Sequence, residues 1–122
     1  MTSLREVVER EVSGWPGVEA RPHRFGGVEL RVRGHEIGHL HGRPMADLPF
    51  PVRMRKELVA EGKAEPQYAL PQTGWASHYP RGPEDPPAVA ELFRLNYEHL
   101  VQKGKKKAER VAPEVTTGEE VR

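Results

Sequence analysis

The stretch Val28-Glu29-Leu30-Arg31-Val32-Arg33-Gly34-His35-Glu36-Ile37-Gly38-His39-Leu40-His41 decides the fold. Its first half alternates apolar and charged side chains, which is the two-residue period of a strand with one buried face. Gly34 interrupts this run, and residues 36–41 follow as a further strand candidate. Upstream, Gly26-Gly27 favours a tight turn after a strand over residues 18–24, because glycine adopts positive φ without a Cβ clash. These three segments predict a meander of short antiparallel strands.

Helical periodicity appears on both sides of this meander. Ser3 and Glu6 fit a capping box at the start of a first helix, which Gly14 ends. A second helix is predicted from about residue 52 to residue 61, where apolar side chains recur at the helical period. Asp85 as N-cap, with two prolines after it, predicts the start of a third helix.

Two more strands are predicted over residues 68–70 and 75–79, while the prolines between residues 44 and 51 indicate a loop. The predicted fold is therefore α+β. It is one domain over residues 1–103, with an antiparallel sheet of about four to six strands and three helices packed mainly on one face. From residue 104 the chain becomes charged and poor in apolar residues. Residues 104–122 are therefore expected to form a charged tail that extends the last helix for a turn or two.

Composition excludes several classes of protein. The chain has 122 residues, a net charge of +1 and no cysteine, which excludes disulfides, thiolate metal ligands and a cysteine nucleophile. It has no apolar run of the roughly 18 residues that a membrane span needs. Its first residues lack an apolar leader, so a cytoplasmic protein without a membrane partner is expected. One asparagine beside 12 prolines leans towards a thermophilic source, and the oligomeric state is left open.

A basic run, Lys103-Gly104-Lys105-Lys106-Lys107, follows the third predicted helix. Such runs bind phosphates or nucleic acids, but here glutamates follow and no aromatic residue is interleaved. Cations also suit the C-terminal end of a helix, where the helix dipole is negative. Nucleic acid is therefore not an expected partner.

The segment His35-Glu36-Ile37-Gly38-His39 matches the H-E-x-x-H motif of zinc hydrolases. On a helix, His35 and His39 would share a face and bind zinc, with Glu36 as the base that deprotonates the metal-bound water. The strand period of the preceding residues opposes this geometry. The interior glycine also opposes it, because glycine costs a helix about 1 kcal/mol relative to alanine. The zinc hydrolase is kept as an alternative that requires residues 35–39 to be helical.

On a strand, the same segment predicts a different site. One face would carry His35, Ile37, His39 and His41, and the other Glu36, Gly38 and Leu40. His39 and His41 would then stand side by side, where two imidazoles can bind a metal or an anionic ligand, or take up a proton near neutral pH. The alternative is that these histidines are partly buried and bonded to backbone carbonyls. Both interpretations are open at this point.

The sequence resembles a known family at several motifs. They are Arg24-Phe25-Gly26-Gly27, the run from Gly34 to His41, Asp47-Leu48-Pro49-Phe50, Leu58-Val59-Ala60-Glu61-Gly62 and Gly74-Trp75. Over residues 15–97 this pattern resembles the luciferase-domain proteins, small proteins of bacteria and fungi whose biochemical role is not established. The resemblance implies that Glu36, His39, His41 and Trp75 belong to a shared site. No flavin or nucleotide motif accompanies it.

The remaining candidates lie outside the histidine segment. Arg24 precedes the double glycine and either points into the site or lies on a strand edge. Trp75 is either a ligand contact or part of the core. His78 follows on the same predicted strand and would supply a third ligand if that strand neighbours the histidine strand. His23 and His99 are expected at the surface.

Three functions follow from these residues. The preferred one is a small binding domain that holds a small polar ligand or a metal, zinc or another divalent ion. Its site would comprise Arg24, Glu36, His39, His41, Trp75 and His78, with His39 and His41 as the metal ligands. The alternatives are the zinc hydrolase and a protein-interaction module whose residues 104–122 dock on a partner. The sequence leaves open whether the protein is an enzyme.

Overall fold

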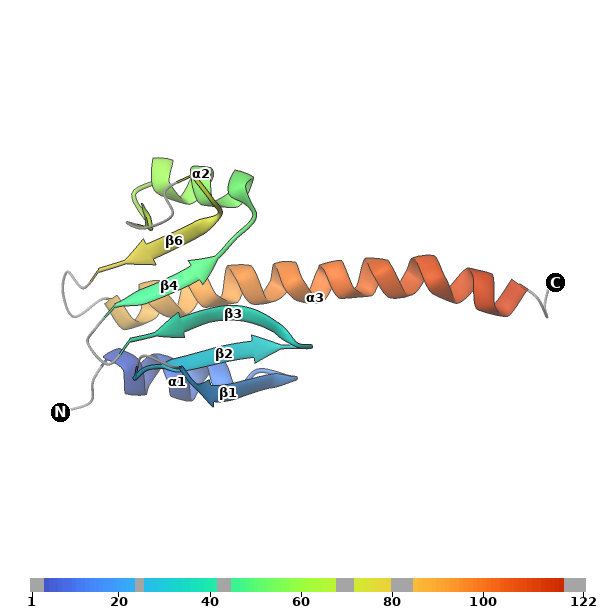
Figure 1. Ribbon diagram of the computed structural model, residues 1–122, viewed down its shortest axis with the longest axis horizontal. Coiled ribbons are helices and arrows are strands. Elements are labelled where there is room, and N and C mark those ends of the chain that lie inside the picture. Colours follow the sequence, from blue (N-terminus) through green and yellow to red (C-terminus); the bar gives the residue numbers. More distant parts are fainter. Residues whose placement is uncertain (1–3, 24–25, 42–44, 68–71, 80–84, 118–122) are drawn as a thin grey trace.

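The computed structural model describes residues 4–23, 26–41, 45–67, 72–79 and 85–117, and within them the chain forms three helices and one six-stranded sheet (Figure 1). The elements in chain order are α1 (Leu4–Ser13), β1 (Val18–Pro22), β2 (Val28–Val32), β3 (His35–Leu40), β4 (Ala46–Pro49), α2 (Val52–Ala60), β5 (Glu65–Pro66), β6 (Trp75–His78) and α3 (Asp85–Thr117). The prediction of a single-domain α+β fold with an antiparallel sheet is confirmed.

The strands lie in the order β1-β2-β3-β4-β6-β5, and every neighbouring pair is antiparallel. The predicted meander comprises β1, β2 and β3. The hairpin between β2 and β3 turns at Arg33 and Gly34, whose φ angles of 54° and 81° are both positive. Two-residue hairpin turns of this hand require positive φ at both positions, and glycine adopts it readily. This requirement explains why Gly34 interrupts the alternating run.

Helices α1 and α3 cover one face of the sheet, and α3 crosses behind β2, β3 and β4 (Figure 1). The core lies between these layers. Its buried members include Val8, Val12, Val28, Leu30, Val32, Ile37, Leu40, Leu48, Val89, Leu92 and Phe93. Burying one such side chain stabilises the fold by about 1.5–3 kcal/mol. Helix α2 contacts β5 and β6, at the opposite edge of the sheet from β1.

Gly38 on β3 lets α3 approach the sheet closely. A Cβ atom at this position would lie 2.8 Å from Cγ of Leu48 and 2.9 Å from Cε2 of Phe93. Real Cβ atoms essentially never make contacts this short, so any larger residue would displace its neighbours. The glycine that argues against a helix over residues 35–39 therefore serves the packing of α3 on a strand.

Two segments differ from the sequence-based expectation. The prolines predict a loop over residues 44–51, but residues 46–49 form β4 in the middle of the sheet, between β3 and β6. Four residues ending in a proline are too few to display a strand period. Strand β5, over residues 65–66, is not among the strands that the sequence predicts. The strand predicted over residues 68–70 falls outside the described residues.

Helix α3 continues to Thr117, past the turn or two that the composition predicts after residue 104, and its C-terminal part projects beyond the sheet (Figure 1). Lysine, alanine, glutamate and arginine dominate this extension, and all four have high helix propensity. Among the described residues, no helix combines the length and the apolar character that crossing a bilayer requires.

Candidate metal centre

A β-bulge in β3 decides which side chains meet. Two consecutive residues of β2 pair with Gly38 and Glu36, so Ile37 between them is an extra residue without a partner in β2. The extra residue shifts the alternation of side chains by one position. Glu36 therefore lies on the same face as His39, and Ile37 is fully buried in the core. The expectation that Ile37 shares a face with the histidines, opposite Glu36, is wrong for this reason.

Asn96 of α3 holds the bulge in place. Its Nδ2 donates to the carbonyl oxygen of Ile37 at 2.8 Å and to that of Pro49 at 3.2 Å. The side chain is fully buried and spans from the bulge in β3 to the end of β4. The helix that covers the core therefore also fixes two strands that carry polar side chains on the opposite face.

His39, His41 and Asp47 meet on the face of the sheet opposite to Gly38 and α3. Asp47 pairs with His39 in the register of β3 and β4 and is 3% exposed. Its Oδ2 lies 2.7 Å from Nε2 of His41 and 3.5 Å from Nε2 of His39. One ligand atom from each of the three side chains lies within 4.8 Å of the others. Two imidazoles and a carboxylate therefore converge on one point.

Two further side chains orient this trio. Oε2 of Glu36 lies 2.6 Å from Nδ1 of His39, on the side of the ring away from Asp47. Ser77 of β6 donates its hydroxyl proton to Oδ1 of Asp47, so Oδ2 is the oxygen that meets the imidazoles. Partners of this kind fix the orientation of a ligand side chain in metal sites.

The charges of His39 and Asp47 are coupled. Burial disfavours the charged form of both groups, but their polar contacts outweigh it. The contacts of His39 with Asp47 and Glu36 raise the pKa of its imidazole to about 9, so the imidazolium form prevails at neutral pH. Hydrogen bonds from the two imidazoles and from Ser77 lower the pKa of Asp47 to about 2.

Three aromatic rings surround His39. The centroid of its ring lies 4.9 Å from that of His41 and 5.6 Å from that of Trp75. The ring of His23, directly after β1, stacks on His39 at 4.2 Å with an interplanar angle of 22°. Burial and the neighbouring His39 lower the pKa of His23 and so favour its neutral form. His23, which the sequence places at the surface, is half-buried and belongs to the cluster.

The register of the sheet explains how His23 reaches the cluster. Arg21 of β1 pairs with Glu29 of β2, and Glu29 pairs with His39 of β3, so these three side chains share a face. His23 follows Arg21 by two residues and continues that face. The alternation of residues 18–24 therefore predicts that His23 lies on the same face of the sheet as His39. Asp47 has no such strand signal, because β4 cannot be recognised among its prolines, and it stands out only as the first residue of the motif Asp47-Leu48-Pro49-Phe50.

The predicted site residues are only partly brought together. Those that meet are Glu36, His39, His41 and Trp75. His78 pairs with Ala46 and lies on the opposite face of β6 from Ser77, so it is not among the converging side chains. Arg24 falls outside the described residues. Three more side chains, those of His23, Asp47 and Ser77, belong to the cluster but are not among the predicted site residues.

The helical alternative is wrong. Residues 35–40 form β3, in which His35 is exposed and His39 is 7% exposed. The two histidines of the H-E-x-x-H motif therefore do not converge, and the hydrolase class defined by that motif does not apply.

The donor set suits a divalent transition-metal ion. Zinc binds imidazole nitrogen and carboxylate oxygen at about 2.0–2.2 Å, often with three protein ligands and a fourth position open. Around a tetrahedral ion at that distance, ligand atoms lie roughly 3.3 Å apart. The separations of 2.7 and 3.5 Å from Oδ2 of Asp47 bracket this value. Small movements of the side chains would therefore admit a metal ion.

The fold and the site define a class: a small α+β domain with a histidine–carboxylate cluster on one sheet face. Residues 34–96 match the family model described as Luciferase domain, which covers about half of the chain. The chain therefore belongs to the luciferase-domain family, as its motifs predict. The matched region contains Glu36, His39, His41, Asp47, Trp75 and Ser77. Comparisons with curated proteins and with solved structures found no match.

Proposed function

We propose that the protein is a small metal-binding domain that holds one divalent transition-metal ion through His39, His41 and Asp47. The observation that carries the proposal is the convergence of their ligand atoms within 4.8 Å, at a place where Glu36 and Ser77 orient them. Zinc is the preferred ion, because it accepts nitrogen and oxygen ligands in tetrahedral geometry. Magnesium and calcium fit less well, because they prefer oxygen ligands.

Electrostatics supports the same proposal. Without a metal, the imidazolium of His39 lies between the carboxylates of Glu36 and Asp47 in a largely buried place. Buried ion pairs of this kind contribute little net stability, because the cost of desolvation offsets the attraction. A metal ion supplies positive charge in place of the proton, so binding releases the proton of His39. Asp47 then serves as a metal ligand, and Glu36 serves as the hydrogen-bond partner of the ligand His39.

Three protein ligands leave a position for an external ligand. At a four-coordinate ion this position takes water, or an oxygen atom of a small polar molecule. The rings of Trp75 and His23 flank His39 and would form walls beside it. The proposed activity is therefore metal-dependent binding of a small polar ligand, and no reaction is assigned.

Titration of the metal-free full chain with Co²⁺ and then Zn²⁺ tests the proposal. Co²⁺ is expected to give the absorption bands of a tetrahedral site at one equivalent, and Zn²⁺ to abolish them. Asp47→Asn and His41→Ala are each expected to weaken binding by about 100-fold or more, since the first removes the charge of the carboxylate ligand and the second removes an imidazole ligand. His35→Ala is the matched control, because His35 is an exposed histidine of the same strand. Absence of saturable binding by the wild type, or an equal loss in His35→Ala, would overturn the proposal.

Other expectations stay predictions. A cytoplasmic location, a thermophilic source and an interaction through residues 104–122 each rest on the sequence. Removing residues 104–122 separates the last of these from metal binding. The proposal expects the shortened chain to keep its affinity for Zn²⁺, because no described residue of the metal centre lies in that segment.

A further inference from the structure

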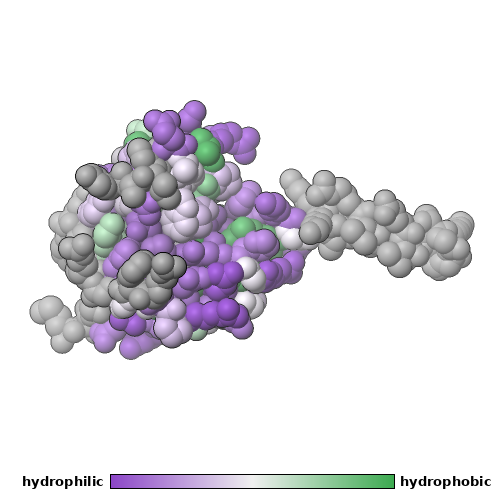
Figure 2. Space-filling model, in the orientation of Figure 1, coloured by the Kyte–Doolittle hydropathy of each residue, from purple (hydrophilic) through white to green (hydrophobic). Residues whose placement is uncertain are grey.

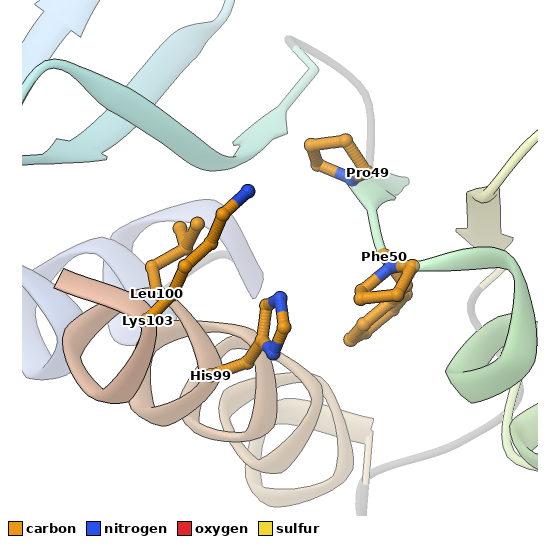
Figure 3. A pocket seen from close by; sticks show the side chains of 6 residues that line it. Pro49, Phe50, His99, Leu100 and Lys103 are labelled. Carbon is orange, nitrogen blue, oxygen red and sulfur yellow. The ribbon is translucent and has the colours of Figure 1, made fainter. Parts of the chain in front are cut away.

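A hollow lies between α3 and the turn that links β4 to α2 (Figure 3). Its volume of about 420 Å³ falls within the roughly 300–1,000 Å³ of small-molecule sites. The lining residues are Pro49, Phe50, Pro51, His99, Leu100 and Lys103. None of them belongs to the metal centre, so this hollow is a separate candidate site.

The wall of the hollow opposite α3 is apolar and fixed by tertiary contacts. Phe50 is 4% exposed, and its backbone nitrogen donates to the carbonyl oxygen of Gly74 at 3.0 Å. Asn96 of α3 donates to the carbonyl oxygen of Pro49 and so ties the two sides together. The hollow is therefore part of the packed fold and is not a gap between independent segments.

The polar groups of the hollow are basic. His99 and Lys103 lie one turn apart on α3 and point towards Pro49 and Phe50 (Figure 3). No acidic side chain lines the hollow, and none of the ion pairs among the described residues involves Lys103. The N-terminus of α2 adjoins the hollow at Pro51, with no side-chain cap and no acidic residue in its first turn. It adds to the positive potential, because the N-terminal end of a helix dipole is positive.

The lining of the hollow is mostly apolar, with Pro49, Phe50, Pro51 and Leu100 beside the two basic side chains. Val52 follows Pro51 and is 43% exposed, one of two large hydrophobic side chains exposed among the described residues. Figure 2 shows hydrophobic residues over α2 and beside α3 on a face that is otherwise largely hydrophilic. A basic group beside an apolar lining matches a ligand with one anionic end and one apolar end.

From the juxtaposition of Lys103 with Pro49, Phe50 and Leu100 we infer that the hollow binds a medium-chain monocarboxylate. Lys103 pairs with the carboxylate, and the three apolar side chains cover the alkyl chain. The apolar contact supplies most of the affinity, at about 25 cal/mol per Å² buried. The single lysine selects the head group, because one cation balances a monoanion. The inference is independent of metal binding, so either can fail without the other.

Calorimetric titration of the full chain with octanoate, below its micelle-forming concentration, tests this inference. Octanol has the chain without the charge, and acetate has the charge without the chain. Octanoate is expected to bind at least about 10-fold more tightly than either, which corresponds to about 1.4 kcal/mol. Backbone amide shifts at Phe50 and Leu100 are expected to locate the ligand. Equal affinity for octanoate and octanol, or no saturable binding of octanoate, would overturn the inference.

Charge variants on α3 complete the test. Lys103→Glu is expected to weaken octanoate binding at least about 10-fold, with the fold intact because Lys103 is exposed. Lys105→Glu makes the same change of charge at an exposed position about 200° around the helix. It is expected to leave the affinity within about two-fold of the wild type. An equal loss of octanoate affinity in the two variants would mean that octanoate is attracted by the general positive charge of α3, and it would overturn the inference.

Discussion

The two faces of the sheet are stabilised in different ways. The face that α1 and α3 cover is apolar, and its main constraint is shape, since no side chain beyond hydrogen fits at Gly38. On the other face, His39 and Asp47 are also buried, but they are held by hydrogen bonds and opposite charges. Ile37 connects the two faces, because this extra residue enters the core and places Glu36 beside His39. Packing on one face therefore sets the polar geometry of the other.

The largest effect on stability is expected at Asp47. In the metal-free protein, Asp47→Ala leaves the imidazolium of His39 with one carboxylate fewer and Ser77 without its acceptor. Removing one partner of a buried charge network costs about 3–5 kcal/mol, and urea unfolding measures it. Glu19→Ala removes the exposed ion pair with Arg21 and is the control, expected within about 0.5 kcal/mol of the wild type. Equal stabilities of the two variants would mean that the network contributes nothing.

The covered face is tested by Gly38→Ala. The added Cβ overlaps Leu48 and Phe93, and overpacking of this kind costs about 1–3 kcal/mol. Gly14→Ala is the control, because a Cβ there meets its nearest atom at an ordinary 3.4 Å. The difference in urea midpoint between the two variants measures the close approach of α3. A Gly38→Ala variant as stable as Gly14→Ala would show that α3 does not pack closely against β3 at this position.

The coupling between the faces is tested by Asn96→Leu. This change removes the donors to Ile37 and Pro49 and is expected to cost about 1–3 kcal/mol of stability. It should also weaken Zn²⁺ binding about 10-fold, because the bulge places Glu36 beside His39. Val89→Ala reduces the same core but keeps the hydrogen bonds of Asn96 to the bulge, and should leave Zn²⁺ affinity unchanged. A drop of Zn²⁺ affinity in both variants would assign the effect to stability alone.

The charges of the polar face also make the stability of the metal-free protein depend on pH. His39 has a folded pKa of about 9, above its value of about 6.5 in an unfolded chain. The contribution of His39 to the free energy of unfolding is therefore fully present below about pH 6.5 and is lost as pH rises through 9. Asp47 has a folded pKa of about 2. Its contribution to the free energy of unfolding is present above about pH 4 and is lost as pH falls through 2. Urea unfolding between pH 6 and pH 9.5 should show the loss in the wild type and a flatter profile in Asp47→Asn.

Sequence reasoning recovers the parts of the molecule whose cause is local. The hairpin over residues 28–41 follows from alternation and a glycine turn, and the three helices follow from periodicity, whereas the predicted N-cap Ser3 lies outside the described residues. Strand β4 escapes this reasoning, because it is short and its prolines resemble those of a loop. Its position between β3 and β6 depends on pairing partners that lie elsewhere in the chain.

The site was harder to predict than the fold. Alternation correctly places His39 and His41 together, but it assigns Glu36 to the wrong face because the bulge cannot be seen locally. The bulge carbonyl is bound by Asn96, 59 residues further along the chain. The third convergent side chain, Asp47, lies in the strand that the prolines conceal. Contacts between distant segments therefore decide the geometry that makes this cluster a candidate metal centre.

X-ray absorption at the zinc edge of the zinc-loaded full chain is the most direct test of the central claim. The account predicts a four-coordinate ion with two imidazole ligands and oxygen in the remaining positions, at about 2.0–2.1 Å. His41→Ala, if it still binds zinc, should lose one imidazole from the spectrum. A zinc ion surrounded only by oxygen, or one whose two imidazoles persist in His41→Ala, would contradict the account.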